Sequence, residues 1–208
     1  KVSMQKTIFL LLAAFFHILY ASAQLGSTPK REFRGTWIQC VNGQFQGLTP
    51  EQMQQRLTQH LNICQAAGIN AVMFQVRAEA DALYKSSYEP WSRFLTGTQG
   101  RNPGWDPLAW MVEQCHKRNM EIHAWINPFR AKTKGTTHLA STPPYLKTPE
   151  RFFEYAGLLI FDPGQTVNHQ YICSVAEHIV GRYDIDGMHI DDNFYPYHVS
   201  RLTIPYQK

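Results

Sequence analysis

The sequence lacks the features that would place it among nucleic-acid-binding or disulfide-rich proteins. Its 208 residues carry a formal net charge of only +4 and no run of Lys and Arg focuses that charge, so we expect no nucleic-acid partner. The four cysteines lie far apart, with no CxxC pair and no zinc-type spacing. We interpret them as small buried apolar groups of helices and strands, although export would permit disulfides. They are Cys40, Cys64, Cys115 and Cys173.

A hydrophobic run long enough for a comfortable transmembrane span is also missing. The apolar run Ile8 to Tyr20 is shorter than the about 20 residues that such a span needs. Lys6 precedes it and Ala21-Ser22-Ala23 follows it, which is the pattern of a secretory signal peptide. We therefore predict a signal peptide over residues 1–23, a linker over 24–32, and a protein exported to the periplasm or beyond without stable membrane insertion. An uncleaved anchor is the alternative.

Strand and helix patterns alternate along the rest of the chain. Thr49-Pro50-Glu51-Gln52 is a capping box with Pro at the first helical position, and Asp106-Pro107 repeats the cap and the Pro. Alternating strands and helices predict right-handed βαβ units on a parallel sheet, an α/β fold. The expected strands cover residues 33–39, 69–77, 121–128 and 187–190, and the expected helices begin at Pro50, Pro107 and Thr166 and end near Gly68, Asn119 and Tyr183.

The stretch Ile185 to Tyr197 is the centre of the functional prediction. An apolar strand there ends in two adjacent carboxylates, Asp191 and Asp192, and an aromatic loop follows. Acids at the carboxyl end of a strand are typical of an α/β-barrel active site. The alternative is that the two acids merely cap a turn or a helix.

Side-chain alternation along the strands indicates which residues face this site. His189 and Asp191 share one face of their strand, which directs Asp191 into the pocket and leaves Asp192 at the rim. Apolar residues such as Met188 and Ile190 should meet the helices. The other strands would add to the polar face Trp37 and Gln39, Gln75 and Arg77, and His123, Trp125 and Asn127.

Five stretches together resemble the glycosyl-hydrolase-like family once catalogued as domain of unknown function 187. They are RGTWIQ, FQVRAEADALY, WINPFR, FDPG and RYDIDGMHIDDNFYPY, between Arg34 and Tyr197. The resemblance implies a TIM (β/α)8 barrel, export from a bacterium and hydrolysis of glycosidic bonds. One enterobacterial relative is understood to cleave peptidoglycan glycan strands stripped of their stem peptides, so cell-wall glycan is the leading substrate class, with other polysaccharides as the alternative.

The number of strands departs from the family pattern. A TIM barrel has eight strands and roughly 250 residues, whereas about four βα units can be counted here. We therefore expect residues 33–208 to be the N-terminal part of a longer barrel, and the chain alone to be inactive.

Glycoside hydrolysis normally uses two carboxyl groups. Asp191 and Asp192 are the candidate catalytic residues. We expect an ionised Asp191 beside Arg77, as a nucleophile or base, and the second carboxyl group can lie outside this chain. Flat aromatic faces, Trp91 and Trp105 among them, can pack against sugar rings, and core packing is the alternative for each. The predicted substrate-binding residues are Arg77, Asp81, Tyr84, Trp125, Asn127, Arg130, His189 and Tyr195.

Two other functions stay open. The first is a glycan-binding protein on a barrel that has lost its chemistry. The second is a metal-dependent hydrolase with His123, His189 and Asp191 as ligands, although imidazoles on neighbouring strands are more often hydrogen-bonding core residues. We expect no cofactor and no metal.

Overall fold

A computed structural model describes residues 32–134, 136, 140 and 144–191. The predicted signal peptide and residues 24–31 of the linker lie outside these residues, as do Asp192 and Tyr195. All helices and strands belong to one compact unit that begins at Arg34. None of the described helices is both long and apolar enough to cross a membrane.

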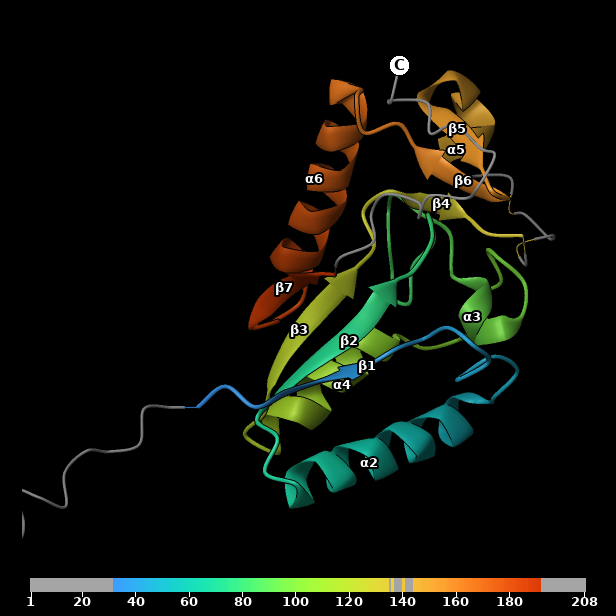
Figure 1. The fold of residues 1–208 in the computed structure, drawn as a ribbon. Coiled ribbons are helices and arrows are strands. Elements are labelled where there is room, and N and C mark those ends of the chain that lie inside the picture. Colours follow the sequence, from blue (N-terminus) through green and yellow to red (C-terminus); the bar gives the residue numbers. More distant parts are fainter. Residues whose placement is uncertain (1–31, 135, 137–139, 141–143, 192–208) are drawn as a thin grey trace, which may run out of the picture. The chain divides into compact units, whose positions relative to one another are not determined.

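A four-stranded parallel sheet forms the centre of this unit (Figure 1). Its order is the chain order, β1-β2-β3-β7, and each neighbouring pair is parallel. The four strands confirm the expected ones with shorter ends. They are β1 (Gly35–Ile38), β2 (Ala71–Arg77), β3 (Glu121–Ile126) and β7 (Gly187–Ile190).

Three longer helices connect the successive strands: α2 (Pro50–Ala66), α4 (Pro107–His116) and α6 (Thr166–Arg182). The capping box of α2 is present, because Thr49 Oγ1 accepts from the Gln52 amide at 3.3 Å and Gln52 Oε1 accepts from the Thr49 amide at 3.0 Å. Gly68 follows α2 with a φ of +72°, a conformation that favours glycine. The predicted connections between strands are therefore confirmed.

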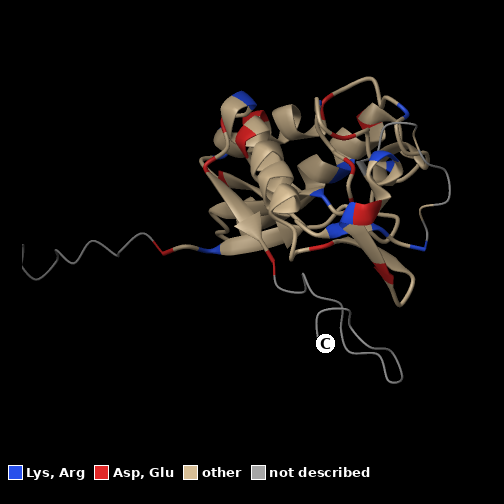
Figure 2. Cartoon of the chain, turned by 90° about the horizontal axis from the view of Figure 1, so that it is seen from above, with Lys and Arg blue, Asp and Glu red and all other residues tan. Residues whose placement is uncertain are grey.

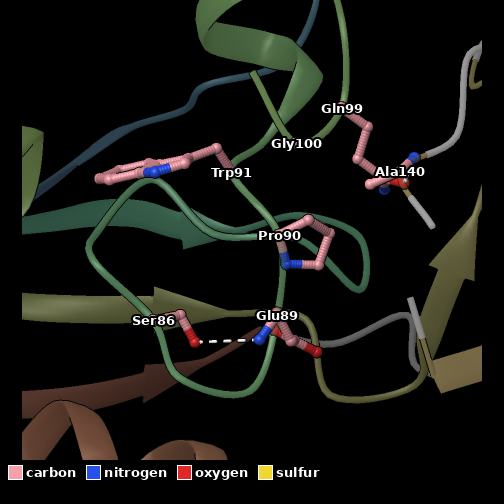
Figure 3. Close-up of a pocket in the computed structure, with 7 residues that line it drawn as sticks. All are labelled: Ser86, Glu89, Pro90, Trp91, Gln99, Gly100 and Ala140. Atoms are coloured by element: carbon pink, nitrogen blue, oxygen red, sulfur yellow. Dashed lines mark hydrogen bonds between the residues drawn. The ribbon is translucent and has the colours of Figure 1, made fainter. Parts of the chain in front are cut away.

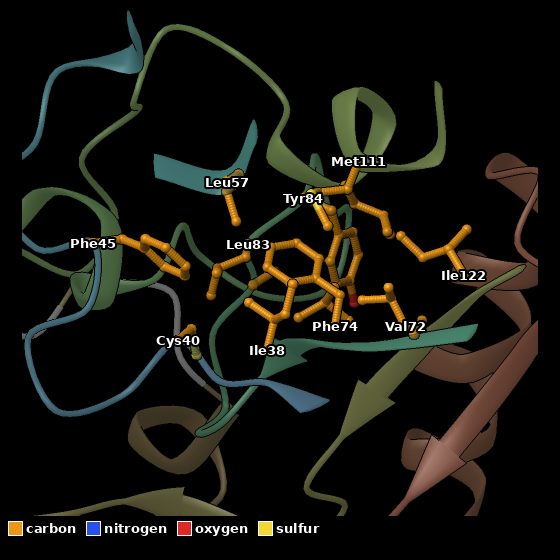
Figure 4. Packing of buried hydrophobic residues seen from close by; sticks show 14 of the residues in the cluster. Ile38, Cys40, Phe45, Leu57, Val72, Phe74, Leu83, Tyr84, Met111 and Ile122 are labelled. Atoms are coloured by element: carbon orange, nitrogen blue, oxygen red, sulfur yellow. The ribbon is translucent and has the colours of Figure 1, made fainter. Parts of the chain in front are cut away.

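The main hydrophobic core lies between the sheet and the helices (Figure 4). Phe74 of β2 and Ile122 of β3 meet Leu57 of α2 and Met111 of α4, and all four are fully buried. Burial of each such side chain contributes about 1.5–3 kcal/mol. This core holds the parallel sheet against its helices, and the loops after the strands extend from it.

A second, antiparallel sheet lies in the connection between β3 and α6, and Figure 1 shows it beyond the carboxyl ends of β2 and β3. Its order is β4-β6-β5. The Ala80 amide donates to the Ala131 carbonyl at 3.1 Å, which attaches it to the loop after β2. The elements of this connection are β4 (Arg130–Lys132), α5 (Pro144–Lys147), η1 (Pro149–Arg151), β5 (Phe152–Tyr155) and β6 (Leu158–Phe161), and the short helix α3 (Arg93–Thr96) lies in the connection from β2 to α4.

Several expectations about burial need correction. Ile190, at the end of β7, is 53% exposed, so it does not meet the helices as alternation predicted. The register of β2 and β3 shifts between Gln75 and Arg77, so alternation does not carry through to Arg77. Cys173 is exposed, and the small-apolar-group interpretation holds fully only for the buried Cys40 and Cys115. All four cysteines are free thiols in this structure.

Candidate active site

Asp191 follows β7 directly, two positions after His189, and both are half-buried. In the register of β3 and β7, His189 lies opposite Trp125, and the two rings meet edge to face with centroids 6.1 Å apart. Trp37 of β1 reaches the same imidazole, because its Nε1–H donates to His189 Nε2 at 2.9 Å. The structure thus confirms that Trp37, Trp125 and His189 share one face of the sheet.

A cavity of about 290 Å³ opens beside the two tryptophans. An apolar ring face together with amide and imidazole groups is a lining suited to a sugar, which presents both C–H and hydroxyl groups. The lining residues are Trp37, Ile38, Gln39, Gln44, His60 and Trp125.

Arg77 binds a different carboxylate from the one that the sequence suggested. Its Nε donates to Glu89 Oε2 at 2.8 Å and its Nη2 donates to Glu89 Oε1 at 2.7 Å. Neither side chain has any solvent exposure. Burial alone would lower the pKa of Arg77, but the Glu89 carboxylate outweighs that effect and raises it. Arg77 therefore has a structural role, since its ion pair with Glu89 holds the loop after β2. The prediction that Arg77 lies beside Asp191 is wrong, and so is the prediction that it contacts the substrate.

Arg77 also holds the end of β3. Its Nη1 donates to the carbonyl oxygens of Asn127 and Pro128, the latter at 3.3 Å. Asn127 in turn accepts the Arg130 amide at its Oδ1 at 3.0 Å, which fixes the turn from β3 into β4. Asn127 and Arg130 thus lie between β3 and β4, where the side chain of Asn127 holds the turn, and substrate binding by these two residues stays a prediction.

A second, largely buried ion pair lies within the connection from β2 to α4, and two threonines of the segment after β4 bind to it. Arg93 Nη2 lies 3.1 Å from Glu79 Oε1, and Arg93 Nε donates to Thr136 Oγ1 at 2.8 Å. Thr133 Oγ1 donates to Glu79 Oε1 at 2.6 Å, and the Thr136 hydroxyl donates to the other oxygen of that carboxylate. These contacts fix two long rim loops to each other.

Asp81 is a buried carboxyl group without an arginine partner of its own. It has no solvent exposure, and its Oδ2 accepts two long hydrogen bonds of 3.4 Å, from the Arg93 amide and from Gln99 Nε2. Its Oδ1 has no partner among the described residues. Burial, and next the nearby Glu79, raise the pKa of Asp81 to about 7. The structure places Asp81 inside the loop, which corrects the prediction that it binds substrate.

Tyr84 is a core residue. Only 1% of it is exposed, and its ring packs against those of Tyr183 and His178. Burial raises the pKa of its hydroxyl well above the ordinary value. The prediction that Tyr84 offers a face to a sugar is therefore wrong, and the alternative of core packing holds.

A further cavity of about 450 Å³ lies in the loop after β2. Figure 3 shows Pro90 and Trp91 next to each other in its wall, with Ser86 Oγ accepting from the Glu89 amide at 3.1 Å. Glu89 connects this cavity to the Arg77 pair. The lining residues are Ser86, Glu89, Pro90, Trp91, Gln99, Gly100 and Ala140.

The proposed metal ligands do not assemble. His123 lies opposite Gly187 in the sheet, and its Nε2 is 3.1 Å from Glu121 Oε2. Among the residues that the structure describes, no group of three or more His, Cys, Asp or Glu side chains could hold a metal ion. Nothing in the described site therefore favours the metal-dependent alternative.

The sequence patterns did not indicate the partners that Arg77, Glu79 and Asp81 have in the loops, which are Glu89, Arg93, Gln99, Thr133 and Thr136. An arginine at the end of an otherwise apolar strand demands a buried acid, and this requirement could have suggested a carboxylate of the following loop in place of Asp191. It could not choose among Glu79, Asp81 and Glu89, because the choice depends on the path of the loop.

Comparison with known families identifies the chain. A family model described as glycosyl hydrolase-like 10 matches residues 32–204, which is most of its length. The chain belongs to this family. Acidic and basic positions are interspersed along the described part of this glycosyl hydrolase-like 10 chain (Figure 2).

Two curated relatives support the assignment. Glycosyl hydrolase YngK of Bacillus subtilis (strain 168) is 40% identical over 183 residues, covering 85% of this chain and 36% of its own length. Glycosyl hydrolase DigH of Escherichia coli (strain K12) is 37% identical over 152 residues, covering 68% of this chain and 35% of its own length. The chain spans about a third of the length of these relatives.

Solved structures show a similar fold at low identity. An Anoxybacillus α-amylase superposes with a TM-score of 0.52 at 16% identity, over 78% of this chain and 42% of its own. The maltogenic α-amylase AmyB of Thermotoga neapolitana gives a TM-score of 0.50 at 16% identity, over 77% of this chain and 40% of its own. These likenesses concern the fold alone.

Proposed function

We propose that this chain is the N-terminal part of an exported glycoside hydrolase that acts on bacterial cell-wall glycan. Membership of the glycosyl hydrolase-like 10 family supports the reaction class. The position of Asp191 supports the site, since it follows β7 at the rim where β7, β3 and β1 bring His189 and two tryptophans together.

The same residues support a barrel. In a flat sheet the first and fourth strands would be about 14 Å apart, three spacings of about 4.8 Å. Trp37 of the first strand nevertheless hydrogen bonds to His189 of the fourth. A sheet that curves toward this face is what the first four strands of a (β/α)8 barrel require. On this proposal residues 33–208 form about four βα units, and the second carboxyl group of the reaction belongs to another part of the protein, so these residues alone are inactive.

Asp191 is the proposed nucleophile or general base. This assignment rests on the position of Asp191 at the end of β7. Arg77 forms an ion pair with Glu89 and therefore gives Asp191 no electrostatic support. Trp125 supplies an apolar ring face for a sugar, and His189, Asn127 and Arg130 supply polar groups at the same rim. Asp192 and Tyr195, which lie outside the described residues, remain proposed contributors. No cofactor, metal or nucleic acid enters the proposal.

The reaction is tested by incubating the longest natural form of the protein with peptidoglycan glycan strands from which the stem peptides have been removed. We expect new reducing ends to be released in proportion to enzyme and time. Starch and cellulose serve as control polysaccharides. Saturable binding of the strands without any release would instead establish the glycan-binding alternative.

Export is a separate part of the proposal and is supported by the sequence pattern at residues 1–23. Amino-terminal sequencing of the protein produced by its own bacterium tests it, with Gln24 as the expected first residue. A mature protein that retains the run from Ile8 to Tyr20 would indicate a membrane anchor.

A further inference from the structure

The contact between Trp37 and His189 determines where the imidazole can carry its proton. An indole N–H is a donor only, so in the 2.9 Å bond from Trp37 Nε1 the acceptor is His189 Nε2. A ring nitrogen that accepts a hydrogen bond carries no proton of its own. The neutral ring must then be protonated on Nδ1.

The imidazole is held on a second side as well. The ring of Trp37 lies at 60° to it with centroids 5.9 Å apart, and the ring of Trp125 lies at 73° with centroids 6.1 Å apart. Because His189 is only half-buried, burial alone does not fix its ring. The two tryptophan rings and the hydrogen bond from Trp37 restrain the rotation of the imidazole. Among the residues that the structure describes, Trp125 Nε1 has no hydrogen-bond partner, so Trp125 contacts the imidazole through packing.

We infer that Trp37 is a positioning residue that fixes His189 as the neutral tautomer protonated on Nδ1. The Nδ1–H is then a hydrogen-bond donor of fixed direction, two residues before Asp191. If the proposed function is right, its acceptor is a hydroxyl oxygen of the sugar that lies against Trp125.

The tautomer can be measured directly, whether or not the protein acts on a glycan. The chain is labelled with ¹⁵N at histidine, and two-bond ¹H–¹⁵N correlation spectra are recorded at neutral pH. A His189→Gln variant identifies the signals of the ring. We expect the wild-type spectrum to show Nδ1 protonated and Nε2 unprotonated, and protonation of Nε2 in the wild type would overturn the inference by itself.

Two variants separate the hydrogen bond from the packing. Trp37→Phe keeps an aromatic ring but removes the N–H, so we expect His189 to shift toward the Nε2-protonated tautomer that free imidazole prefers. Trp125→Phe is the matched control, because it alters the ring contact alone and should leave the tautomer as in the wild type. An unchanged pattern in a folded Trp37→Phe protein would contradict the positioning role.

Kinetics on the longest natural form test the link to substrate. Loss of one neutral hydrogen bond predicts that Trp37→Phe raises KM by about three- to tenfold and changes kcat less. A fall in kcat with unchanged KM would contradict the sugar contact. A wild-type protein with the expected tautomer but without glycan turnover would refute the proposed function and leave the tautomer assignment intact.

Discussion

At the scale of single residues, the Arg77–Glu89 pair has a calculable effect on stability. Both side chains are fully buried, and removal of one partner leaves an uncompensated charge in the interior, which costs about 3–5 kcal/mol. We expect Glu89→Gln to lower the free energy of unfolding by that amount in urea denaturation.

The exposed pair of Lys117 and Glu113 provides the control, since these side chains are 60% and 57% exposed. Glu113→Gln should cost less than about 1 kcal/mol. The double variant Arg77→Met with Glu89→Leu should be less destabilised than Glu89→Gln, because it leaves no buried charge behind. Equal and small effects of Glu89→Gln and Glu113→Gln would contradict the buried pair.

The raised pKa of the buried Asp81 makes the stability of the folded chain depend on pH. Its pKa is about 7 in the folded chain, whereas the ordinary value for an aspartate, taken here for the unfolded chain, is 3.8. At a pH between these two pKa values, the folded state keeps a proton on Asp81 that the unfolded state has lost. Stability contributed by this group is therefore greatest below about pH 4, falls as pH rises and levels off above about pH 7. Asp81→Asn removes this penalty and should stabilise the chain at pH 8 by up to about 4 kcal/mol.

The measurement compares unfolding of Asp81→Asn and the wild type from pH 4 to pH 8. The difference in free energy should grow with pH and then become constant. A difference that is the same at every pH would show that Asp81 is ionised throughout the range.

Residue-level prediction from the sequence succeeded where alternation along a strand decides the outcome. Trp37, Trp125 and His189 share a face because each belongs to a regular strand. Arg77 follows a register shift in β2, and its partner Glu89 lies in the following loop. Neither the shift nor the path of that loop leaves a periodic signal, so the pair could not be derived.

At the scale of secondary-structure elements, Gly187 of β7 packs closely against the ring of His123, its register partner in β3. A Cβ atom at this position would lie 2.5 Å from the His123 ring, whereas a Cβ atom at Gly181 in α6 would meet nothing within 4 Å. We expect Gly187→Ala to destabilise the chain by about 1–3 kcal/mol, because the ring must move. Gly181→Ala should stabilise it by about 0.4–1 kcal/mol, since alanine restricts the unfolded chain.

Thermal unfolding of the two variants measures whether Gly187→Ala lowers the stability of the chain while Gly181→Ala raises it. Combining Gly187→Ala with His123→Ala should restore part of the lost stability, since the clash is then removed. Equal effects of Gly187→Ala and Gly181→Ala would contradict the close packing of β3 on β7.

The elements that the sequence predicted are those with strong local signals. The helices α2 and α4 begin at a cap followed by Pro, and the parallel strands are apolar runs. The strands β4, β5 and β6 have three or four residues each, too few for alternation to be recognised, and they pair through contacts that the sequence does not reveal. The antiparallel sheet was therefore missed.

At the scale of the whole molecule, the described unit carries one wall of the proposed site. Its parallel sheet brings Trp37, Trp125 and His189 to one face, Asp191 follows the last of these strands, and two ion pairs, one fully and one largely buried, stabilise the loops at the rim. The chain spans about a third of the length of its curated relatives. The fold class followed from the alternation of strands and helices, whereas the reaction class came from motifs shared with a family.

The most direct test of the proposed mechanism is the turnover of Asp191→Asn on peptide-free glycan strands, compared with Asp192→Asn in the longest natural form of the protein. The substitution keeps the shape of the side chain and removes its charge. If Asp191 is the nucleophile or base, kcat falls by several orders of magnitude with glycan binding nearly intact, because the lost interaction belongs to the transition state, and Asp192→Asn has a smaller effect. Equal and mild losses in the two variants would contradict the catalytic assignment.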